Sequence, residues 1–164
     1  MKRVPLTQGY ESVVDDADYE LVMAVGPWCA AVRPRNVYAA RCIRCADDRW
    51  STQLLHTFLT GWPETDHRDH DGLNNRRENL RPATRNQNNA NHRLRLSSAS
   101  GFKGVTWHKR AGRWRAQITS EYRNIYLGLF GSAEEAARAY DVAALAMWGD
   151  FAHLNFPREG EQGV

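Results

Sequence analysis

The feature that most constrains the fold of this chain is a strict alternation of apolar and polar residues over 113–119. Side chains of a β-strand point alternately to its two faces, so this pattern predicts a strand with one buried and one exposed face. The apolar set is Trp114, Ala116 and Ile118, and the polar set is Arg113, Arg115, Gln117 and Thr119.

Two neighbouring segments extend this strand into a sheet. Residues 124–129 alternate in the same way, with Ile125, Leu127 and Leu129 as the apolar set, and residues 102–108 precede a turn at Ala111-Gly112. Short strands joined by such turns predict an antiparallel three-stranded sheet.

A helix is predicted directly after the sheet. Ser132 followed by Glu135 is a capping box, and Gly149 suits the end of a helix that runs to about Trp148. We expect its stripe of Ala136, Tyr140, Ala143 and Met147 to pack on the apolar face of the sheet.

The opposite face of the sheet is then available to a partner, and it is cationic. Residues 100–126 contain six Lys or Arg and one acid, Glu121. A cationic sheet face attracts phosphate and can be placed in the major groove of DNA. A merely solvated strand face is the alternative.

The sequence of this region is similar to a known DNA-binding family. The marks are GFKGV at 101–105, WRAQI at 114–118, YLG at 126–128, AEEAARAYD at 133–141 and LNFP at 154–157. They resemble the plant ethylene-response-factor (APETALA-type) domain. The resemblance implies that the residues facing DNA are Lys103, Thr106, His108, Arg110, Arg113, Arg115, Gln117, Thr119, Asn124 and Tyr126.

The sequence also departs from the plant pattern. Thr106, Thr119 and Asn124 stand where arginine is usual, and one extra residue lengthens the first hairpin. The plant target sequence therefore cannot be transferred to this chain.

A second motif lies upstream, where residues 66–81 read DHRDHDGLNNRRENLR. A turn around Gly72 separates two short extended segments, 65–68 and 79–82, and Thr84 with Gln87 marks the start of a helix over 85–93. Adjacent Asp and His followed by a helix rich in amides provide the residue types of a one-metal phosphodiesterase site. Oxygen ligands suit Mg²⁺ or Mn²⁺, and an imidazole can take a proton from water near neutral pH.

The spacing of these residues resembles the H-N-N form of the HNH (ββα-metal) homing endonucleases. Asn79 follows His67 by twelve residues, and Asn88 follows Asp66 by twenty-two. The resemblance implies that His67 is the general base, oriented by Asn79. It implies that Asp66 and Asn88 bind one divalent cation, Mg²⁺ or Mn²⁺. A polar surface loop is the alternative, and His92 is a further candidate ligand.

The combined prediction is an α+β protein with five segments. The segments are a small supporting sheet (1–60), the ββα-metal element (61–93), a linker (94–100), the DNA-binding domain (101–157) and a tail (158–164). Arg93, just before the linker, and Arg95, within it, could contact phosphate groups.

We therefore expect a homing-type endonuclease that hydrolyses double-stranded DNA as a monomer, encoded by a phage or mobile element and acting in the cytoplasm of a bacterial host. The alternative is a non-catalytic DNA-binding or regulatory protein with a degenerate nuclease element. A weaker third class is an RNA-binding module, which would be expected to carry a run of stacking aromatics.

Composition agrees with small modules rather than one large core. The chain has 164 residues, a net charge of +3 and 42% hydrophobic residues, with no long apolar run that suggests a membrane span or a signal peptide. No small-molecule substrate is expected. Cys42 and Cys45 form a lone CxxC pair, and with Cys29 they are expected to be free thiols, although a zinc site is the alternative.

Overall fold

The computed structural model describes residues 1–34, 36–91 and 99–157, and it divides the chain into two compact units. The N-terminal unit is Met1–Thr84 and the C-terminal unit is Arg85–Val164. The division falls inside residues 61–93, for which the sequence predicts a single element.

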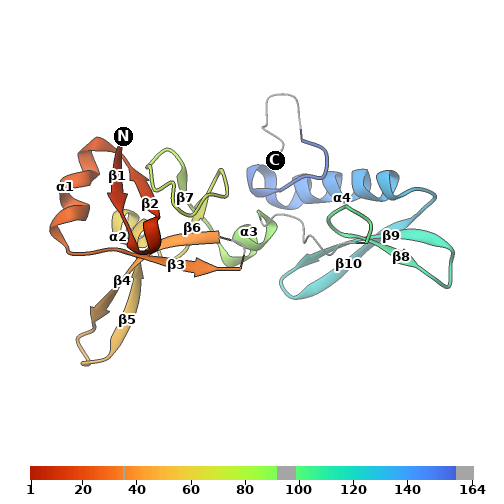
Figure 1. The fold of residues 1–164 in the computed structure, drawn as a ribbon. Helices are drawn as coiled ribbons and strands as arrows, with labels where there is room; N and C mark the ends of the chain where they lie inside the picture. Colours follow the sequence, from red (N-terminus) through yellow and green to blue (C-terminus); the bar gives the residue numbers. More distant parts are fainter. Residues whose placement is uncertain (35, 92–98, 158–164) are drawn as a thin grey trace. The chain divides into compact units, whose positions relative to one another are not determined.

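The N-terminal unit is built from short strands and the two α-helices α1 and α2 (Figure 1). The first strands, β1 (Lys2–Pro5) and β2 (Glu11–Val14), pair antiparallel and are followed by α1 (Asp16–Ala24). A three-stranded sheet in the order β3-β4-β5 follows, then α2 and the β6–β7 pair. The bounds of these later elements are β3 (Cys29–Arg33), β4 (Asn36–Arg44), β5 (Trp50–Leu54), α2 (Leu55–Thr60), β6 (Thr65–His67) and β7 (Leu80–Pro82).

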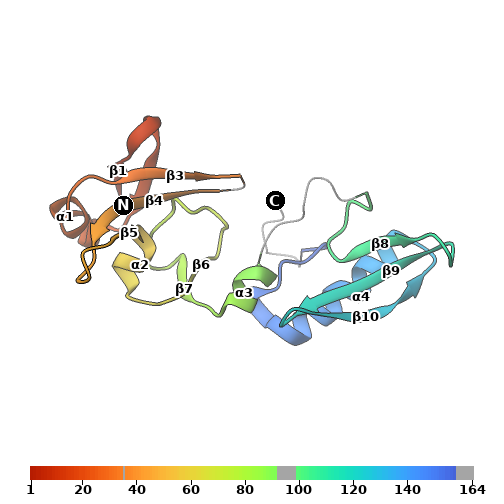
Figure 2. The same ribbon diagram turned by 90° about the horizontal axis from the view of Figure 1, so that it is seen from below.

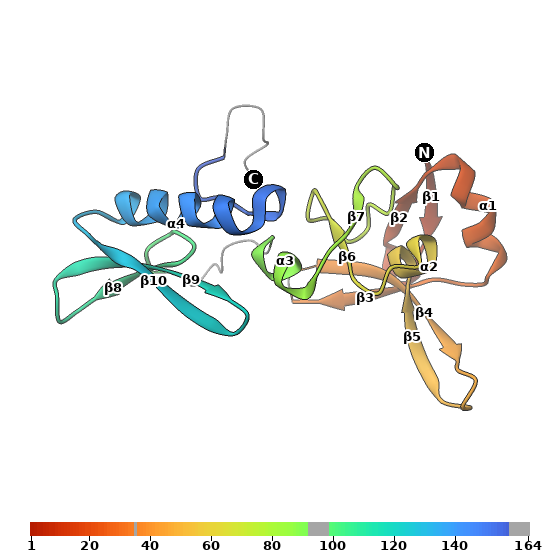
Figure 3. The same ribbon diagram turned by 180° about the vertical axis from the view of Figure 1, so that it is seen from behind.

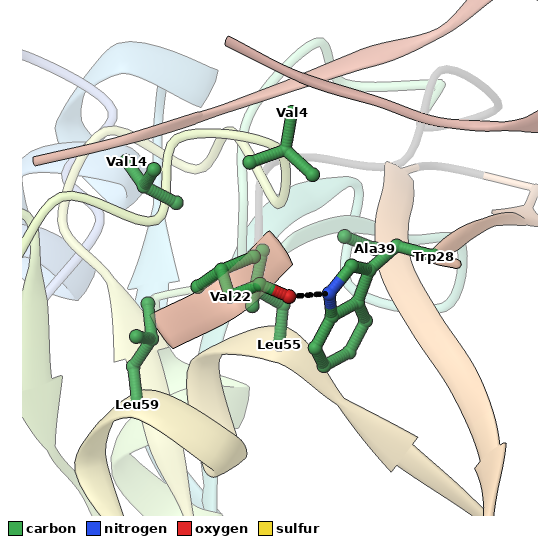
Figure 4. Close-up of a cluster of buried hydrophobic side chains, with 7 residues drawn as sticks. All are labelled: Val4, Val14, Val22, Trp28, Ala39, Leu55 and Leu59. Carbon is green, nitrogen blue, oxygen red and sulfur yellow. Dashed lines mark hydrogen bonds between the residues drawn. The ribbon is translucent and has the colours of Figure 1, made fainter. Parts of the chain in front are cut away.

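A small apolar core holds this unit together. In this core the indole Nε1 of Trp28 donates a hydrogen bond of 3.0 Å to the backbone oxygen of Val22 (Figure 4). The indole has one N–H donor, so this bond allows it to be buried. The core residues are Val4, Val14, Val22, Trp28, Ala39, Leu55 and Leu59.

The C-terminal unit confirms the predicted sheet and helix. Its strands are β8 (Val105–His108), β9 (Arg113–Ser120) and β10 (Arg123–Phe130), in the antiparallel order β10-β9-β8. Helix α4 (Ala133–Trp148) lies along one face of the sheet (Figures 1 and 3), and Figure 2 looks onto the face that α4 leaves uncovered. A short helix, α3 (Arg85–Ala90), precedes the sheet in the chain.

Helix α4 begins and ends where the sequence predicts. The Ser132 side chain accepts a hydrogen bond from the Glu135 backbone, the reciprocal bond completes the capping box, and Gly149 follows the last turn. The predicted stripe is only partly right, because Met147 is 41% exposed. Buried on α4 are Ala136, Ala137, Tyr140, Asp141 and Ala144.

The predicted alternation of β10 is also only partly right. Its register with β9 runs from Tyr126 opposite Gln117 to Gly128 opposite Ala116, so one residue is inserted as a β-bulge at Leu127. Beyond the bulge every side chain changes face, which places Leu129 opposite Arg115 rather than on the apolar side.

Gly104 allows the chain to enter β8 close to α4. Its φ is +75°, and a Cβ at this position would collide with the Tyr140 ring and lie 2.7 Å from the backbone oxygen of Gln117. Gly112 also has a positive φ, +60°, but open space surrounds the position of its missing Cβ.

We therefore expect Gly104→Ala to destabilise the C-terminal unit by about 3 kcal/mol or more, because backbone and ring must both move. Gly112→Ala should cost only the conformational strain, about 1 kcal/mol. Urea unfolding of the two variants beside the wild type measures the difference. Equal losses in the two variants would show that close packing at Gly104 is unimportant.

Candidate nucleic-acid interface

The uncovered face of the β8–β10 sheet collects most of the predicted DNA-facing residues. In β9 the residues Ala116 and Ile118 are buried beneath the sheet, which directs Arg113, Arg115 and Gln117 outward. Cross-strand pairs place the others beside them. These pairs are His108 opposite Arg113, Thr106 opposite Arg115, Tyr126 opposite Gln117, and Asn124 opposite Thr119.

Several of these side chains are oriented by one another. The Arg115 Nε donates to the Thr106 hydroxyl oxygen at 3.3 Å, and the Thr119 hydroxyl donates to Asn124 Oδ1 at 2.6 Å. His108 accepts the Ala111 backbone N–H at its Nδ1, 3.1 Å away, which fixes the ring against the turn. The face therefore presents partly ordered polar groups beside the 61% exposed ring of Tyr126.

Lys103 does not belong to this face, contrary to the prediction. Its ammonium donates to the backbone oxygen of Ala90, the last residue of α3, and burial lowers the pKa of Lys103 to about 8. The prediction failed because position along the chain cannot show that α3 provides an acceptor. Lys103 is thus a structural link between α3 and the loop before β8.

Two further predicted positions differ from the strand residues. Arg110 is exposed in the turn between β8 and β9 rather than on a strand. The predicted phosphate contacts Arg93 and Arg95, and the candidate ligand His92, lie outside the described residues.

A network of hydrogen bonds around Asp141 holds the sheet against the C-terminal segment. The Asp141 carboxylate accepts from the backbone N–H groups of Asn155 and Phe156, at 2.8 and 2.9 Å, and from the Asn155 side chain at 3.0 Å. Asn155 Oδ1 in turn accepts the Lys103 N–H at 2.6 Å. The loop that enters β8 is therefore tied to α4 through one asparagine.

In the N-terminal unit, three of the predicted metal-site residues lie together on or beside the β6–β7 pair. Asp66 and Arg81 are directly opposite each other, and both Arg81 Nε and Nη2 lie 2.7 Å from Asp66 Oδ2. Both residues are buried. A guanidinium already neutralises the carboxylate that the sequence analysis assigned to a divalent cation.

His67 is also buried, and its orientation comes from a residue that the sequence analysis did not single out. Its Nε2 lies 3.2 Å from Asn75 Oδ1, and Asn75, which is completely buried, donates to the Ser12 hydroxyl at 2.8 Å. Edge-to-face contact with the His56 ring, 4.9 Å between centroids, completes the packing. Asn75 lies inside the motif at 66–81, and its amide side chain was the only sign in the sequence that it belongs to this cluster.

The side chain of Asn79 forms hydrogen bonds within the loop between β6 and β7. Its side-chain nitrogen donates to Asp69 Oδ1 and to the Asn74 backbone oxygen, both at 2.8 Å, while its Oδ1 accepts the Asp69 N–H. The partner described for His67 is Asn75 instead. The motif thus forms a loop that is held together by hydrogen bonds of its own amide side chains.

The fourth predicted residue, Asn88, is in α3 and so belongs to the C-terminal unit. Within the described ranges, no group of three or more His, Cys, Asp or Glu side chains is arranged to hold a metal ion. Asp66 is held in an ion pair with Arg81, and we derive no chemical step through a divalent cation. The cofactor stays an untested prediction.

Comparison with known proteins identifies the C-terminal sheet. Residues 100–150 match the family model described as the AP2 domain. AP2-like ethylene-responsive transcription factor ANT of Arabidopsis thaliana is 42% identical over 85 residues, covering 48% of this chain and 15% of that protein. APETALA2-like protein 2 of Oryza sativa is 45% identical over 60 residues, covering 37% and 14%. No solved structure matches the chain significantly.

Residues 100–150 therefore carry an AP2 domain. A three-stranded antiparallel sheet packed on one C-terminal helix fits that family. The chain spans less than a quarter of the length of the curated relatives that it matches.

These findings contradict the main functional prediction. The matched proteins are named as transcription factors, so the predictions of an HNH endonuclease, of metal-dependent phosphodiester hydrolysis and of a phage-type protein in a bacterial cytoplasm are wrong. The HNH spacing has no support in the comparisons, and the catalytic roles given to His67 and Asn79 lose their basis. No helix of the described part of the chain is long and apolar enough to cross a membrane.

The buried histidines make the N-terminal unit sensitive to acid. Burial lowers the pKa of His56 to about 3, with the nearby His67 adding to the effect, and burial also lowers the pKa of His67. In the unfolded chain both imidazoles become protonated below about pH 6.5. In the folded unit His56 becomes protonated only near pH 3. Stability is therefore full above pH 6.5 and falls as the pH drops toward 3.

We expect the N-terminal unit to lose about 2 kcal/mol between pH 7 and pH 5 from His56 alone. His56→Phe should reduce this loss by that amount, while His108→Gln in the other unit should leave it unchanged. Hydrogen exchange of the α2 backbone amides, followed at both pH values, measures the stability locally. An unchanged pH dependence in His56→Phe would show that this histidine titrates normally.

Proposed function

We propose that this chain is a non-catalytic DNA-binding regulatory protein whose C-terminal unit binds double-stranded DNA through the uncovered face of the β8–β10 sheet. The observation that carries the proposal is that the two faces of this sheet differ, one apolar and covered, the other polar and uncovered. Helix α4 covers the apolar side, and the register of β9 directs Arg113, Arg115 and Gln117 to the other side.

The chemistry of this face suits a duplex. Arginine guanidinium groups can bind phosphates or guanine edges, and Gln117 can form two hydrogen bonds with an adenine edge. The major groove admits a two-stranded β-ribbon, so two neighbouring strands of this sheet can enter it. These properties support contact with both the backbone and the bases.

The comparisons support the same proposal. The relatives of this region are named as AP2-like or ethylene-responsive transcription factors, a class of regulators that act on DNA. Their similarity covers the sheet and helix rather than whole proteins, so DNA binding is the property that we carry over. The target sequence is not carried over, because Thr106, Thr119 and Asn124 depart from the usual plant residues.

We expect replacement of Arg113 and Arg115 together by alanine to weaken duplex binding and to flatten its dependence on salt. Each lost phosphate contact should reduce the slope of log affinity against log salt by roughly one. Titration of a labelled duplex at several salt concentrations provides both values.

Arg138→Ala is the control, since it removes one arginine charge from the exposed side of α4 rather than from the sheet. Its salt slope should equal that of the wild type. A folded Arg113/Arg115 variant that retains wild-type affinity and slope would refute the proposed interface.

Lys103→Met separates a structural lysine from a DNA contact. Because the Lys103 ammonium is bonded to Ala90, its loss should destabilise the unit by about 1–3 kcal/mol and leave the salt slope unchanged under folded conditions. Urea unfolding and the same duplex titration test both parts. A reduction of about one in the slope of log affinity against log salt would show that Lys103 contacts DNA.

A further inference from the structure

The bulge in β10 changes the composition of the outward face. Leu127 is the inserted residue and packs against the core beneath the sheet, and Gly128 adopts a φ of +140° that side-chain-bearing residues rarely take. After this irregularity the pairing continues with Leu129 opposite Arg115. Residues directly opposite in an antiparallel pair project to the same side, so Leu129 shares the outward face with Arg115.

Leu129 therefore belongs to a cross-strand row with Thr106 and Arg115. The Arg115 Nε donates to the Thr106 hydroxyl on β8, which draws the guanidinium toward that strand and away from β10. Leu129 is half-buried and stands on the other side of Arg115. The row presents a hydroxyl, a guanidinium and an aliphatic side chain in that order.

An aliphatic side chain has few favourable partners on DNA. It cannot donate or accept a hydrogen bond, and it gains nothing beside a charged phosphate, which would lose hydration. The C5-methyl group of thymine is the apolar feature of the major-groove edge, whereas guanine offers the O6 and N7 acceptors that suit arginine.

We propose that Leu129 contacts the C5-methyl group of a thymine next to the base pair that Arg115 reads, which makes it a specificity-determining residue. This inference rests on the proposed DNA-binding function and deepens it. The side-by-side positions of Arg115 and Leu129 predict that a preferred site contains a thymine adjacent to a guanine, on either strand.

The test begins with a duplex obtained by selecting bound sequences from a random pool with the full chain. Each thymine is then replaced singly by deoxyuridine, which removes only the methyl group. We expect one such replacement, beside a guanine, to weaken binding by the wild type about fourfold, the effect of one buried methyl-sized group.

In Leu129→Ala the same replacement should have no effect, because the partner of the methyl group is gone. Leu129→Gln, similar in length and polar, provides the same test if the alanine variant proves unstable. Arg113→Ala is the control. It should weaken binding to both duplexes equally and keep the fourfold discrimination, so that lost affinity is distinguished from lost methyl recognition.

Three results would overturn the inference. Deoxyuridine could be neutral at every thymine, its effect could persist in Leu129→Ala and Leu129→Gln, or the wild type could bind duplexes without selecting a common sequence. Each of these leaves DNA binding itself intact. Failure of the wild type to bind any duplex would instead refute the proposed function, and the role of Leu129 with it.

Discussion

The C-terminal unit depends on one buried carboxylate. Asp141, on the inner side of α4, accepts three hydrogen bonds from Asn155 and Phe156 and so fixes the segment that follows the helix. Hydrogen bonds to a carboxylate are about twice as strong as bonds between neutral groups, and here they compensate for its burial. Because Asn155 also bonds both backbone groups of Lys103, the same carboxylate sets the entry of the chain into β8.

This arrangement explains why the outward face can be rich in polar and cationic groups without weakening the fold. The buried apolar contacts lie on the other side of the sheet, where small alanines of α4 approach Ala116 and Ile118 closely. The outward side chains interact mainly with one another, through Arg115 with Thr106 and Thr119 with Asn124. They are therefore available to a partner at little structural cost.

Much of this unit could be predicted from the sequence, because local rules determine it. Alternation specified the face of each β9 residue, and Ser132 with Glu135 specified the start of α4. The position of Lys103 could not be predicted, since its acceptor is the end of a helix thirteen residues earlier. In the first sixty residues, no pattern predicts strand β3 or helix α2, because their sequences are short and lack a clear period.

The HNH prediction failed for a related reason. The same residue types can also hold a loop together by hydrogen bonds, and Asn79 does this by donating to Asp69 and to the Asn74 backbone oxygen. Spacing does not reveal that Asp66 faces Arg81 across two paired strands, or that Asn75 satisfies His67. A motif read from residue types alone cannot separate a reactive cluster from a buried network of hydrogen bonds.

The bulge at Leu127 shows how far one backbone irregularity can alter a surface. Without it, strict alternation would place Ile125, Leu127 and Leu129 all against α4, and the outward face would contain only polar and aromatic side chains. One inserted residue, permitted by the positive φ of Gly128, exchanges the faces for the rest of the strand. Two chains with similar β10 sequences can therefore present different chemistry to DNA if only one is bulged, and register must be known before contact residues are assigned.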